Sequence, residues 1–301
     1  MTYPIKYNDE FLARVEALHV GGRDLPDYSQ WIKDHMGGRV VAFRERLLPH
    51  ILAFTDLSDV DVLDFGCGTG SSTVVLAEAS AAGRITGVDI DAVSLQIANL
   101  RFTHHGLDNR IATRVIKPIE KAGDLDLPSE QFDFALLNGV LEHVVPFRNR
   151  SAVLLEVWRT LRPGGMLFVS ETPNLVWPYD RHTTGLPLIP WLPDRWAHRI
   201  SVALGRHNEE GDLESRGRRG MTFWGIVRPL RATGPVEVLN ITHTGNRLFP
   251  GRPAFRPSTK RRFATAVLER GLGPILTRLG IPATALGPFI EYLCLRKPPA
   301  A

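Results

Sequence analysis

The chain has 301 residues, of which 44% are hydrophobic and 23% are charged. This composition is that of a folded protein with a substantial core, and it excludes a disordered chain. No run of eighteen apolar residues occurs and residues 1–30 lack a basic start followed by an apolar core, so we expect neither a transmembrane helix nor a secretory signal. Cys67 and Cys294 are too few for a disulfide framework or a cysteine zinc site. We therefore expect a protein of the reducing cytoplasm.

The net charge of +4 conceals an uneven distribution along the chain. Residues 206–262 carry twelve Lys and Arg against five Asp and Glu. A basic stretch of this kind attracts phosphate groups, anionic lipid or nucleic acid, or it is a solvated arginine-rich loop. The sequence leaves both interpretations open.

Helical periodicity marks the first part of the chain. Residues 8–20 place apolar side chains at helical spacing behind Asn8, which is a candidate N-cap. A second helical stretch surrounds residues 40–54, and we expect it to be broken near Gly37-Gly38 and at Pro49. These segments predict helices that precede the core.

From Val60 onward, short apolar runs alternate with amphipathic segments, which is typical of repeated βαβ units around a parallel sheet. Five buried strands are predicted at residues 61–66, 83–90, 110–116, 132–138 and 165–171. Three helices are predicted between them at residues 71–82, 92–105 and 149–161. A glycine that can adopt the left-handed conformation stands at or near the end of each helix, at Gly83, Gly106 and Gly164.

The alternation stops after Glu171, where Pro, Trp and Gly become frequent. An irregular stretch of about fifty residues points to a lid or binding insertion. It contains a predicted helix at residues 194–204. A helix at 223–232, a strand at 236–244, a helical stretch at 261–279 and a strand at 289–296 follow. The whole pattern predicts an α/β fold with a doubly wound, mostly parallel seven-stranded sheet. Its predicted parts are an N-terminal helical lead-in (1–57), the doubly wound core (58–172), an acceptor-binding insertion or lid (173–222) and a C-terminal completion of the sheet with a helical insertion (223–301).

The glycine-rich segment 64–70 (DFGCGTG) follows a predicted strand and opens a predicted helix, which is where an open α/β sheet binds a nucleotide-like ligand. Its glycines let the backbone approach the ligand, and free N–H groups at the helix start can meet negative charge. Asp89 ends the next strand, where a carboxylate can accept hydrogen bonds from both hydroxyls of a ribose. A helix N-cap is the alternative role for Asp89, although Asp91 can serve that role instead.

With Asp64 before the glycines and Ser71 after them, the loop resembles motif I of class I S-adenosylmethionine (SAM) dependent methyltransferases. It departs from the dinucleotide fingerprint, which has a third Gly or Ala one position later. Two further segments resemble the same family, FDFALLNGVLEHV at 132–144 and LRPGGMLFVSETPN at 161–174. The resemblance covers residues 60–175 well and the final strand pair loosely. It implies a Rossmann-like fold with SAM as the cofactor and S-adenosylhomocysteine as its product.

In that family the loop cradles the aminoacyl part of the cofactor. Many relatives hold the adenine with an acidic residue after the third strand, but residues 117–120 here are KPIE. Adenine binding by packing on Ile119 with backbone groups and binding by Glu120 therefore stay open. Cys67 is interpreted as a small residue that fits the loop, since nothing beside it would activate a thiol. The resemblance implies the cofactor-binding residues Asp64, Gly66, Cys67, Gly68, Gly70, Asp89, Ile90, Ile119, Glu120 and Asn138.

Methyl transfer from a sulfonium needs an aligned acceptor and the exclusion of water, and a hydroxyl acceptor must also lose its proton. The resemblance places the pocket mouth above strands four and five, with candidates at Glu142, His143, Tyr179, Asp180, Arg181 and His182. We predict His182 and His143 as the catalytic residues, acting as a base or orienting the acceptor. The alternative for His182 is that it orders a Pro-rich lid. Trp177, Trp191 and Trp196 are candidate walls of the acceptor pocket, or they pack the lid on its own domain. No metal ligand is predicted.

The sequence thus predicts a cytoplasmic SAM-dependent methyltransferase (EC 2.1.1.-) that acts on a hydroxyl of a small molecule, glycan or natural product. An RNA methyltransferase that uses residues 206–262 is the nearest alternative, but the sequence contains no recognisable RNA-binding module. An NAD-linked oxidoreductase and a SAM-binding pseudoenzyme are the others. Residues 259–280 are partly amphipathic behind a basic cluster. They predict contact with a membrane surface or lipid-linked acceptor, or else cover for the sheet edge or a homodimer interface.

Overall fold

The computed structural model describes residues 7–20, 28–80, 83–121, 123–208, 211–239 and 274–299. The chain divides into two compact units. The first comprises residues 1–118 and 125–136, and the second comprises residues 119–124 and 137–301.

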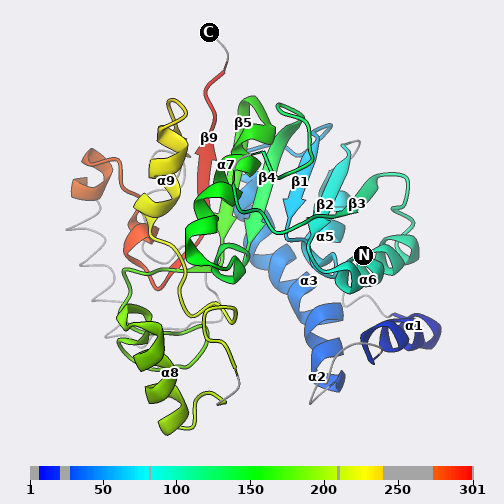
Figure 1. Ribbon diagram of the computed structural model, residues 1–301. Helices are drawn as coiled ribbons and strands as arrows, with labels where there is room; N and C mark the ends of the chain where they lie inside the picture. Colours follow the sequence, from blue (N-terminus) through cyan, green and yellow to red (C-terminus); the bar gives the residue numbers. More distant parts are fainter. Residues whose placement is uncertain are drawn as a thin grey trace, which may run out of the picture. The chain divides into compact units, whose positions relative to one another are not determined.

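A seven-stranded sheet has the order β3-β2-β1-β4-β5-β9-β7 (Figure 1). Its strands are β1 (Val62–Phe65), β2 (Ile85–Asp89), β3 (Ile111–Val115), β4 (Phe132–Asn138), β5 (Leu161–Ser170), β7 (Glu237–Val238) and β9 (Leu293–Arg296). Strands β1, β2 and β3 pair in parallel, whereas β9 is antiparallel to both β5 and β7. The order reverses between β1 and β4, and ligands of such sheets bind beyond the carboxyl ends of the strands at this reversal. The predicted α/β class and sheet are confirmed.

Within the first unit, helical backbone runs without interruption from Tyr28 to Leu52. The elements are α2 (Tyr28–Ile32), the π-helix η1 (Lys33–Gly38), α3 (Arg39–Ala42), the π-helix η2 (Phe43–Leu47) and α4 (Leu48–Leu52). The predicted breaks are wrong. Gly38 has helical angles, φ −56° and ψ −45°. Pro49 lies where η2 passes into α4, and the helix continues beyond it, since the N–H of Ala53 donates to its carbonyl oxygen at 3.2 Å.

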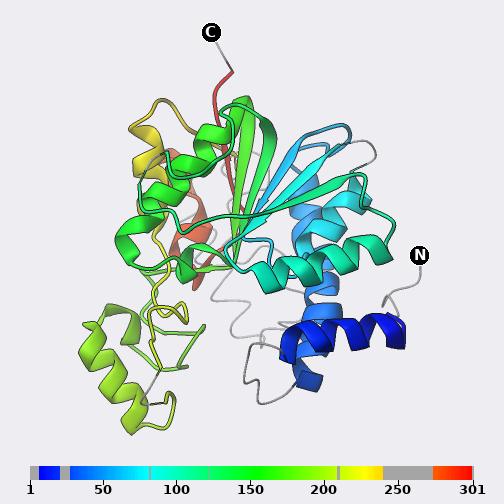
Figure 2. The same cartoon turned by 45° about the vertical axis from the view of Figure 1, so that its right-hand side comes forward.

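Helix α1 (Asp9–Val20) packs against α6 (Ala92–His104) in the same unit (Figure 2). The predicted cap is confirmed, because the backbone N–H of Phe11 donates to Oδ1 of Asn8 at 2.8 Å. The contact is a small apolar cluster of Phe11, Val15, Met36 and Ile97. The N-terminal helices therefore cover a helix of the sheet's outer layer.

Only one of the three glycines predicted to end helices does so, and Gly164, with φ +84°, lies within β5. Gly106 follows α6 with φ +65°, as expected. Helix α5 (Ser71–Ala79) instead ends at Ser80 in extended backbone, and Gly83 is not left-handed. A Cβ at Gly83 would lie 2.0 Å from the carbonyl oxygen of Val60, so a close approach of two backbone segments requires this glycine.

The second unit holds α7 (Arg150–Thr160), which packs against α9 (Phe223–Arg231). The predicted insertion helix is confirmed as α8 (Asp194–Ala203). The predicted last strand is split in two, because Tyr292 with φ +55° separates β8 (Phe289–Ile290) from β9. Strand β8 pairs with β6 (Thr172–Pro173) in a separate two-stranded sheet.

The remaining short helices of this unit are η3 (Leu141–His143), η4 (Phe147–Asn149), η5 (Ile189–Trp191) and η7 (Ala283–Leu286). Residues 240–273, which include most of the predicted strand 236–244 and most of the amphipathic segment 259–280, lie outside the described residues. Among the helices that the structure describes, none has the length and apolar character needed to cross a membrane.

Candidate functional site

The glycine loop joins the fully buried strand β1 to α5 within the first unit. Gly66, Gly68 and Gly70 all have positive φ, at +76°, +52° and +76°. A Cβ on Gly70 would lie 2.6 Å from the ring of Phe102, whereas one on Gly68 would meet nothing within 4 Å. Gly70 is thus required by packing against α6, and Gly68 borders open space where a ligand can approach the backbone.

Asp64 ends up buried behind this loop, with 1% of its surface exposed. Its Oδ2 accepts hydrogen bonds from the hydroxyls of Ser72 and Thr73, both at 2.7 Å. Burial raises the pKa of Asp64 to about 6, against the opposing effect of these two hydrogen bonds. The carboxyl group therefore ties the first turn of α5 to β1.

Asp89, at the end of β2, is half-buried beside the loop. Its Oδ2 accepts from the N–H of Gly68 at 2.8 Å and its Oδ1 from the N–H of Asp91 at 2.9 Å. Each oxygen keeps a further lone pair, so the carboxylate can still accept from ribose hydroxyls. Asp91 is the N-cap of α6, since its side chain accepts from the N–H of Val93. The next side chain, Ile90, is apolar and 61% exposed.

Cys67 is buried in the loop and its thiol is free. Its Sγ would lie 2.9 Å from a Cβ at Gly87 of β2. Burial raises the pKa of this thiol well above its usual range. The side chain is therefore a packing residue rather than a nucleophile, as the sequence predicted, and only its backbone remains for a cofactor.

The other predicted cofactor residues belong to the second unit. Asn138 ends β4, and its Oδ1 is buried without a hydrogen-bond partner among the described residues. Ile119 is buried, with 4% of its surface exposed. Glu120 is exposed, and its backbone N–H donates to Oδ2 of Asp124 at 2.9 Å. Neither the Ile119 nor the Glu120 interpretation of adenine binding is excluded.

These features fit a SAM molecule in the fold. The open space at Gly68 would admit the aminoacyl part of the cofactor, and Asp89 has lone pairs for its ribose. The exposed face of Ile90, in the same unit, would cover adenine.

A second group of side chains lies within the second unit. It consists of Glu142, His143 and His182 and is called the Glu–His–His cluster. Glu142 and His143 belong to η3, while His182 comes from the insertion. One potential ligand atom from each side chain lies within 4.8 Å of the others. Oε1 of Glu142 is 3.9 Å from Nε2 of His182, and the two imidazole rings are 5.6 Å apart between centroids. The structure thus unites two predicted catalytic histidines with a carboxyl group.

Hydrogen bonds define which ring nitrogens are free. Nδ1 of His143 lies 3.0 Å from the carbonyl oxygen of Ser215, so it must be the protonated nitrogen. The hydroxyl of Thr183 donates to the carbonyl of Arg216 at 3.2 Å, which leaves its oxygen to accept from Nδ1–H of His182 at 3.3 Å. Both neutral imidazoles therefore keep their lone pair on Nε2.

The electrostatics of the cluster follow from burial. Glu142 is 1% exposed, and burial raises its pKa to about 8, opposed by the nearby Arg150 guanidinium. The pKa of His182 is lowered by burial and by His143. His143 itself is exposed. The cluster therefore combines one buried acid with an imidazole that solvent and small ligands can reach.

Asp180, a predicted candidate, organises the insertion around His182. It is 2% exposed and accepts from the backbone N–H groups of His182, Thr183 and Thr184, at 3.1, 2.9 and 2.9 Å. It also accepts from the Thr184 hydroxyl at 2.7 Å. Asp180 thus fixes the turn from which His182 projects.

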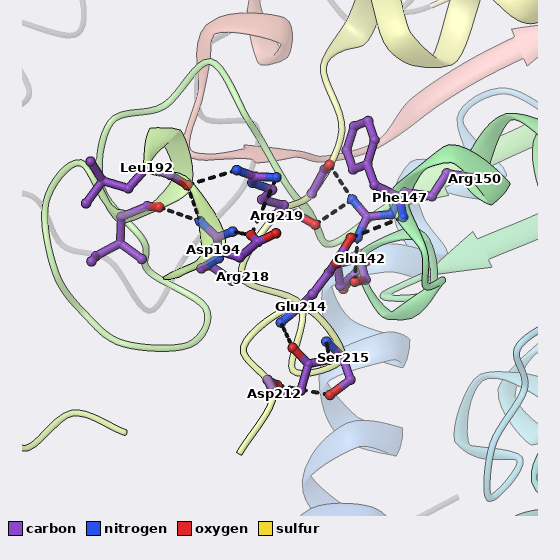
Figure 3. A network of polar contacts seen from close by, with 12 residues as sticks. Glu142, Phe147, Arg150, Leu192, Asp194, Asp212, Glu214, Ser215, Arg218 and Arg219 are labelled. Carbon is purple, nitrogen blue, oxygen red and sulfur yellow. Dashed lines mark hydrogen bonds and ion pairs between the residues drawn. The ribbon is translucent and has the colours of Figure 1, made fainter. Parts of the chain in front are cut away.

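Two arginines that the sequence analysis missed tie this region together (Figure 3). Arg150 donates to the carbonyl oxygens of Glu142, Val144, Arg219 and Gly220. Arg218, buried and in the basic stretch, donates to the carbonyls of Ile189 and Leu192 and to Asp194. Arg218 is internal, so the solvated-loop interpretation is wrong for it. An arginine that binds carbonyls through space leaves no local sequence signal.

Gly217 is a third missed residue. It has φ +83°, and a Cβ there would lie 2.9 Å from both Cγ of Glu142 and Cε1 of His182. A glycine is therefore required for residues 211–222 to close against the cluster. Its position between arginines in ESRGRRG was the available sequence signal.

The predicted tryptophan walls have different environments. Trp191 is 52% exposed and its Nε1–H donates to the carbonyl of Leu175 at 2.8 Å. Trp196 is 46% exposed on α8, with the guanidinium groups of Arg195 and Arg199 5.8 and 5.7 Å from its ring centroid. The opposite face of α8 packs Ala197 against the apolar cluster of Ile189 and Leu213.

Comparison with known proteins assigns the class. Residues 63–169 match the Methyltransf_11 family, described as a methyltransferase domain. They include β1, the glycine loop, Asp89 and the Glu142–His143 pair. This segment is a class I SAM-dependent methyltransferase domain, and SAM is its cofactor.

Three curated relatives illustrate the breadth of acceptors. Arsenite methyltransferase of Mus musculus is 32% identical over 120 residues, which are 38% of this chain and 31% of that protein. Demethylmenaquinone methyltransferase of Tropheryma whipplei is 38% identical over 111 residues, 37% of this chain and 41% of that protein. Ubiquinone biosynthesis O-methyltransferase of Pseudomonas aeruginosa is 26% identical over 193 residues, 62% and 79% of the two chains. The first two matches span less than half of those proteins.

Proposed function

We propose that the chain is a SAM-dependent methyltransferase whose acceptor is a hydroxyl of a small molecule, such as a glycan or natural product. The observation that supports the acceptor is the Glu–His–His cluster, where the buried Glu142 lies 3.9 Å from His182 of the insertion. Such a set of groups can hold a hydroxyl and take its proton. The relatives' names support a small-molecule acceptor, and one of the three names specifies O-methyl transfer.

When bound, SAM supplies a methyl group on a positively charged sulfur. The glycine loop gives the cofactor its backbone cradle, and Asp89 accepts from its ribose while holding Gly68 in place. Ile90 would pack on adenine, and Ile119 and Glu120 are separate candidates for holding it. With SAM bound, the acceptor oxygen would form a bond to the methyl carbon as the carbon–sulfur bond breaks, and a histidine of the cluster would take the hydroxyl proton. His182 and His143 orient the acceptor or remove the proton.

The predicted parts then have separate tasks. Residues 58–172 hold the cofactor, and residues 173–222 supply the acceptor pocket, with Trp177, Trp191 and Trp196 as apolar walls. The predicted lipid contact or dimer interface rests on residues 259–280, most of which lie outside the described residues. The RNA alternative loses support at Arg218, whose charge is used inside the protein.

The first test is calorimetric titration of the purified chain with S-adenosylhomocysteine, with NAD as the control ligand. We expect saturable binding of S-adenosylhomocysteine alone. NAD binding alone would replace the proposal with an oxidoreductase, and cofactor binding without turnover of any hydroxyl acceptor would favour a pseudoenzyme.

The second test compares His182→Ala with His198→Ala, a histidine on α8 outside the cluster. Turnover is measured as S-adenosylhomocysteine release with phenols, catechols and sugars as acceptors. We expect His182→Ala to lower turnover by 10²-fold or more, on the order of a lost general acid–base group, with unchanged cofactor affinity. Equal turnover of the two variants would remove His182 from the proposal.

A further inference from the structure

The Glu–His–His cluster offers one carboxylate oxygen and two imidazole nitrogens, and these atoms lie within 4.8 Å of one another. Two histidines and one carboxylate form the donor set of catalytic zinc and non-haem iron sites. In a tetrahedral zinc site neighbouring donors lie roughly 3.3 Å apart, because each metal–ligand bond is about 2.0–2.1 Å. The 3.9 Å between Glu142 Oε1 and His182 Nε2 reaches that spacing with a small side-chain movement.

The hydrogen bonds orient lone pairs toward one another. Since Thr183 takes the Nδ1–H of His182, the Nε2 lone pair of this ring faces Oε1 of Glu142. A distance of 3.9 Å is too long for a hydrogen bond between the two atoms. A cation placed between these two atoms would be bound by both of them.

Among the described residues, the Glu142 carboxyl group has hydrogen bonds with the Thr172 hydroxyl and with its own backbone N–H. Arg150 is close to Glu142, but its guanidinium donates to four backbone carbonyls. Oε2 of Glu142 has no hydrogen-bond partner among the described residues, although the side chain is 1% exposed. A metal ion that displaces the proton of this buried carboxyl group would give it a charged partner.

The outer contacts are those of metal-binding histidines. Such histidines donate their second ring N–H to a carbonyl or another acceptor, which fixes the ring. His143 does so to the Ser215 carbonyl and His182 to Thr183 Oγ1. His143 is exposed, so the cluster can be reached by an ion and by an acceptor.

We propose that Glu142, His143 and His182 bind one divalent transition-metal ion of the zinc type, leaving a coordination position for the acceptor hydroxyl. The binding site stands on the cluster itself, whereas its role rests on the proposed function. The ion holds the acceptor oxygen and lowers the pKa of its hydroxyl, whose proton passes to solvent. His182 then acts as a ligand that positions the acceptor rather than as the base.

The direct test is calorimetric titration of the full chain with Zn²⁺, and optical titration with Co²⁺, in the absence of SAM. We expect one site per chain, with affinity reduced at least tenfold in His182→Ala and Glu142→Gln and unchanged in His198→Ala. Equal Zn²⁺ affinity in the wild type and His182→Ala, or no saturable site, overturns the proposal.

A matched pair of variants tests the site without removing a ligand. Thr183→Val deletes the hydroxyl beside His182 Nδ1 and leaves the Arg216 carbonyl as the remaining acceptor for this ring, whereas Thr183→Ser keeps the hydroxyl. We expect Thr183→Val to weaken Zn²⁺ binding by roughly 10 to 100-fold and Thr183→Ser to retain it. Equal affinities in the two variants would contradict the assigned orientation of His182.

The metal inference and the proposed function fail separately. Stoichiometric Zn²⁺ binding with no transfer to any tested hydroxyl would support the site and contradict the proposed acceptor. Methyl transfer that is undiminished after chelation would support the proposed function and overturn the role of the ion. Loss of turnover on chelation and recovery with Zn²⁺ would support both.

Discussion

At the scale of single residues, two aspartates two positions apart have different partners. Asp89 holds the Gly68 N–H, and Asp91 caps α6 through the Val93 N–H. We expect Asp89→Ala to weaken S-adenosylhomocysteine binding at least tenfold, because both the ribose acceptor and the loop anchor are lost. Asp91→Ala should lower stability by about 1 kcal/mol and leave the affinity unchanged. Calorimetry and urea unfolding of both variants measure this, and unchanged affinity in Asp89→Ala would contradict the ribose contact.

Asp64 gives a stability prediction that depends on pH. Its pKa is raised from 3.8 to about 6 in the folded protein, so the folded state binds this proton more tightly than the unfolded state. The resulting stabilisation is present below pH 3.8 and is lost as pH rises through about 6. Asp64→Asn does not titrate. The stability of the wild type relative to this variant should therefore fall by about 2 kcal/mol between pH 4 and 7, measured by urea unfolding. A constant difference would show that Asp64 keeps its ordinary pKa.

At the scale of elements, the glycine loop depends on how α5 and α6 pack. Gly70 and Gly106 have φ of +76° and +65°, but only at Gly70 would a Cβ overlap a ring, that of Phe102 at 2.6 Å. We expect Gly106→Ala to cost about 1 kcal/mol through backbone strain alone. Gly70→Ala should cost about 2–4 kcal/mol and also weaken cofactor binding, because the loop must shift. Denaturant unfolding compares the two, and equal costs would contradict the packing argument.

At the scale of the molecule, Arg218 joins residues 189–194 of the insertion to the segment that follows α8. Its donors bind the carbonyls of Ile189 and Leu192, and its neighbour Arg216 is exposed. Arg218→Met leaves the Ile189 carbonyl without its charged donor, whereas Leu192 keeps Arg219, and the change should lower stability by about 2–4 kcal/mol, with faster proteolysis of the insertion. Arg216→Met is the control and should change little. S-adenosylhomocysteine affinity should stay intact in both, since the glycine loop belongs to the other unit.

Several features of the fold were predictable because they depend on neighbours in sequence. The buried runs of β1, β2 and β4 and the capping by Asn8 are local, as is the glycine loop between strand and helix. The break predicted at Gly37-Gly38 failed because packing of Met36 and its neighbours overrides the weak helix propensity of glycine. A left-handed Gly83 failed for a similar reason, since its role is set by contact with Val60.

Some features of the candidate site were likewise predictable from the sequence, and others were not. The sequence alone determined the class of domain, the cofactor loop with Asp89, and the two histidines to test, because these are carried by motifs of fixed spacing. Only the tertiary structure decided that Glu142 and His182, forty residues apart, lie 3.9 Å from each other, and that Gly217 must close against both. It also decided that Arg150 and Arg218 are internal donors rather than surface charge. Hydrogen bonds and burial across long sequence separations depend on how the whole chain packs, and no local pattern of residues encodes them.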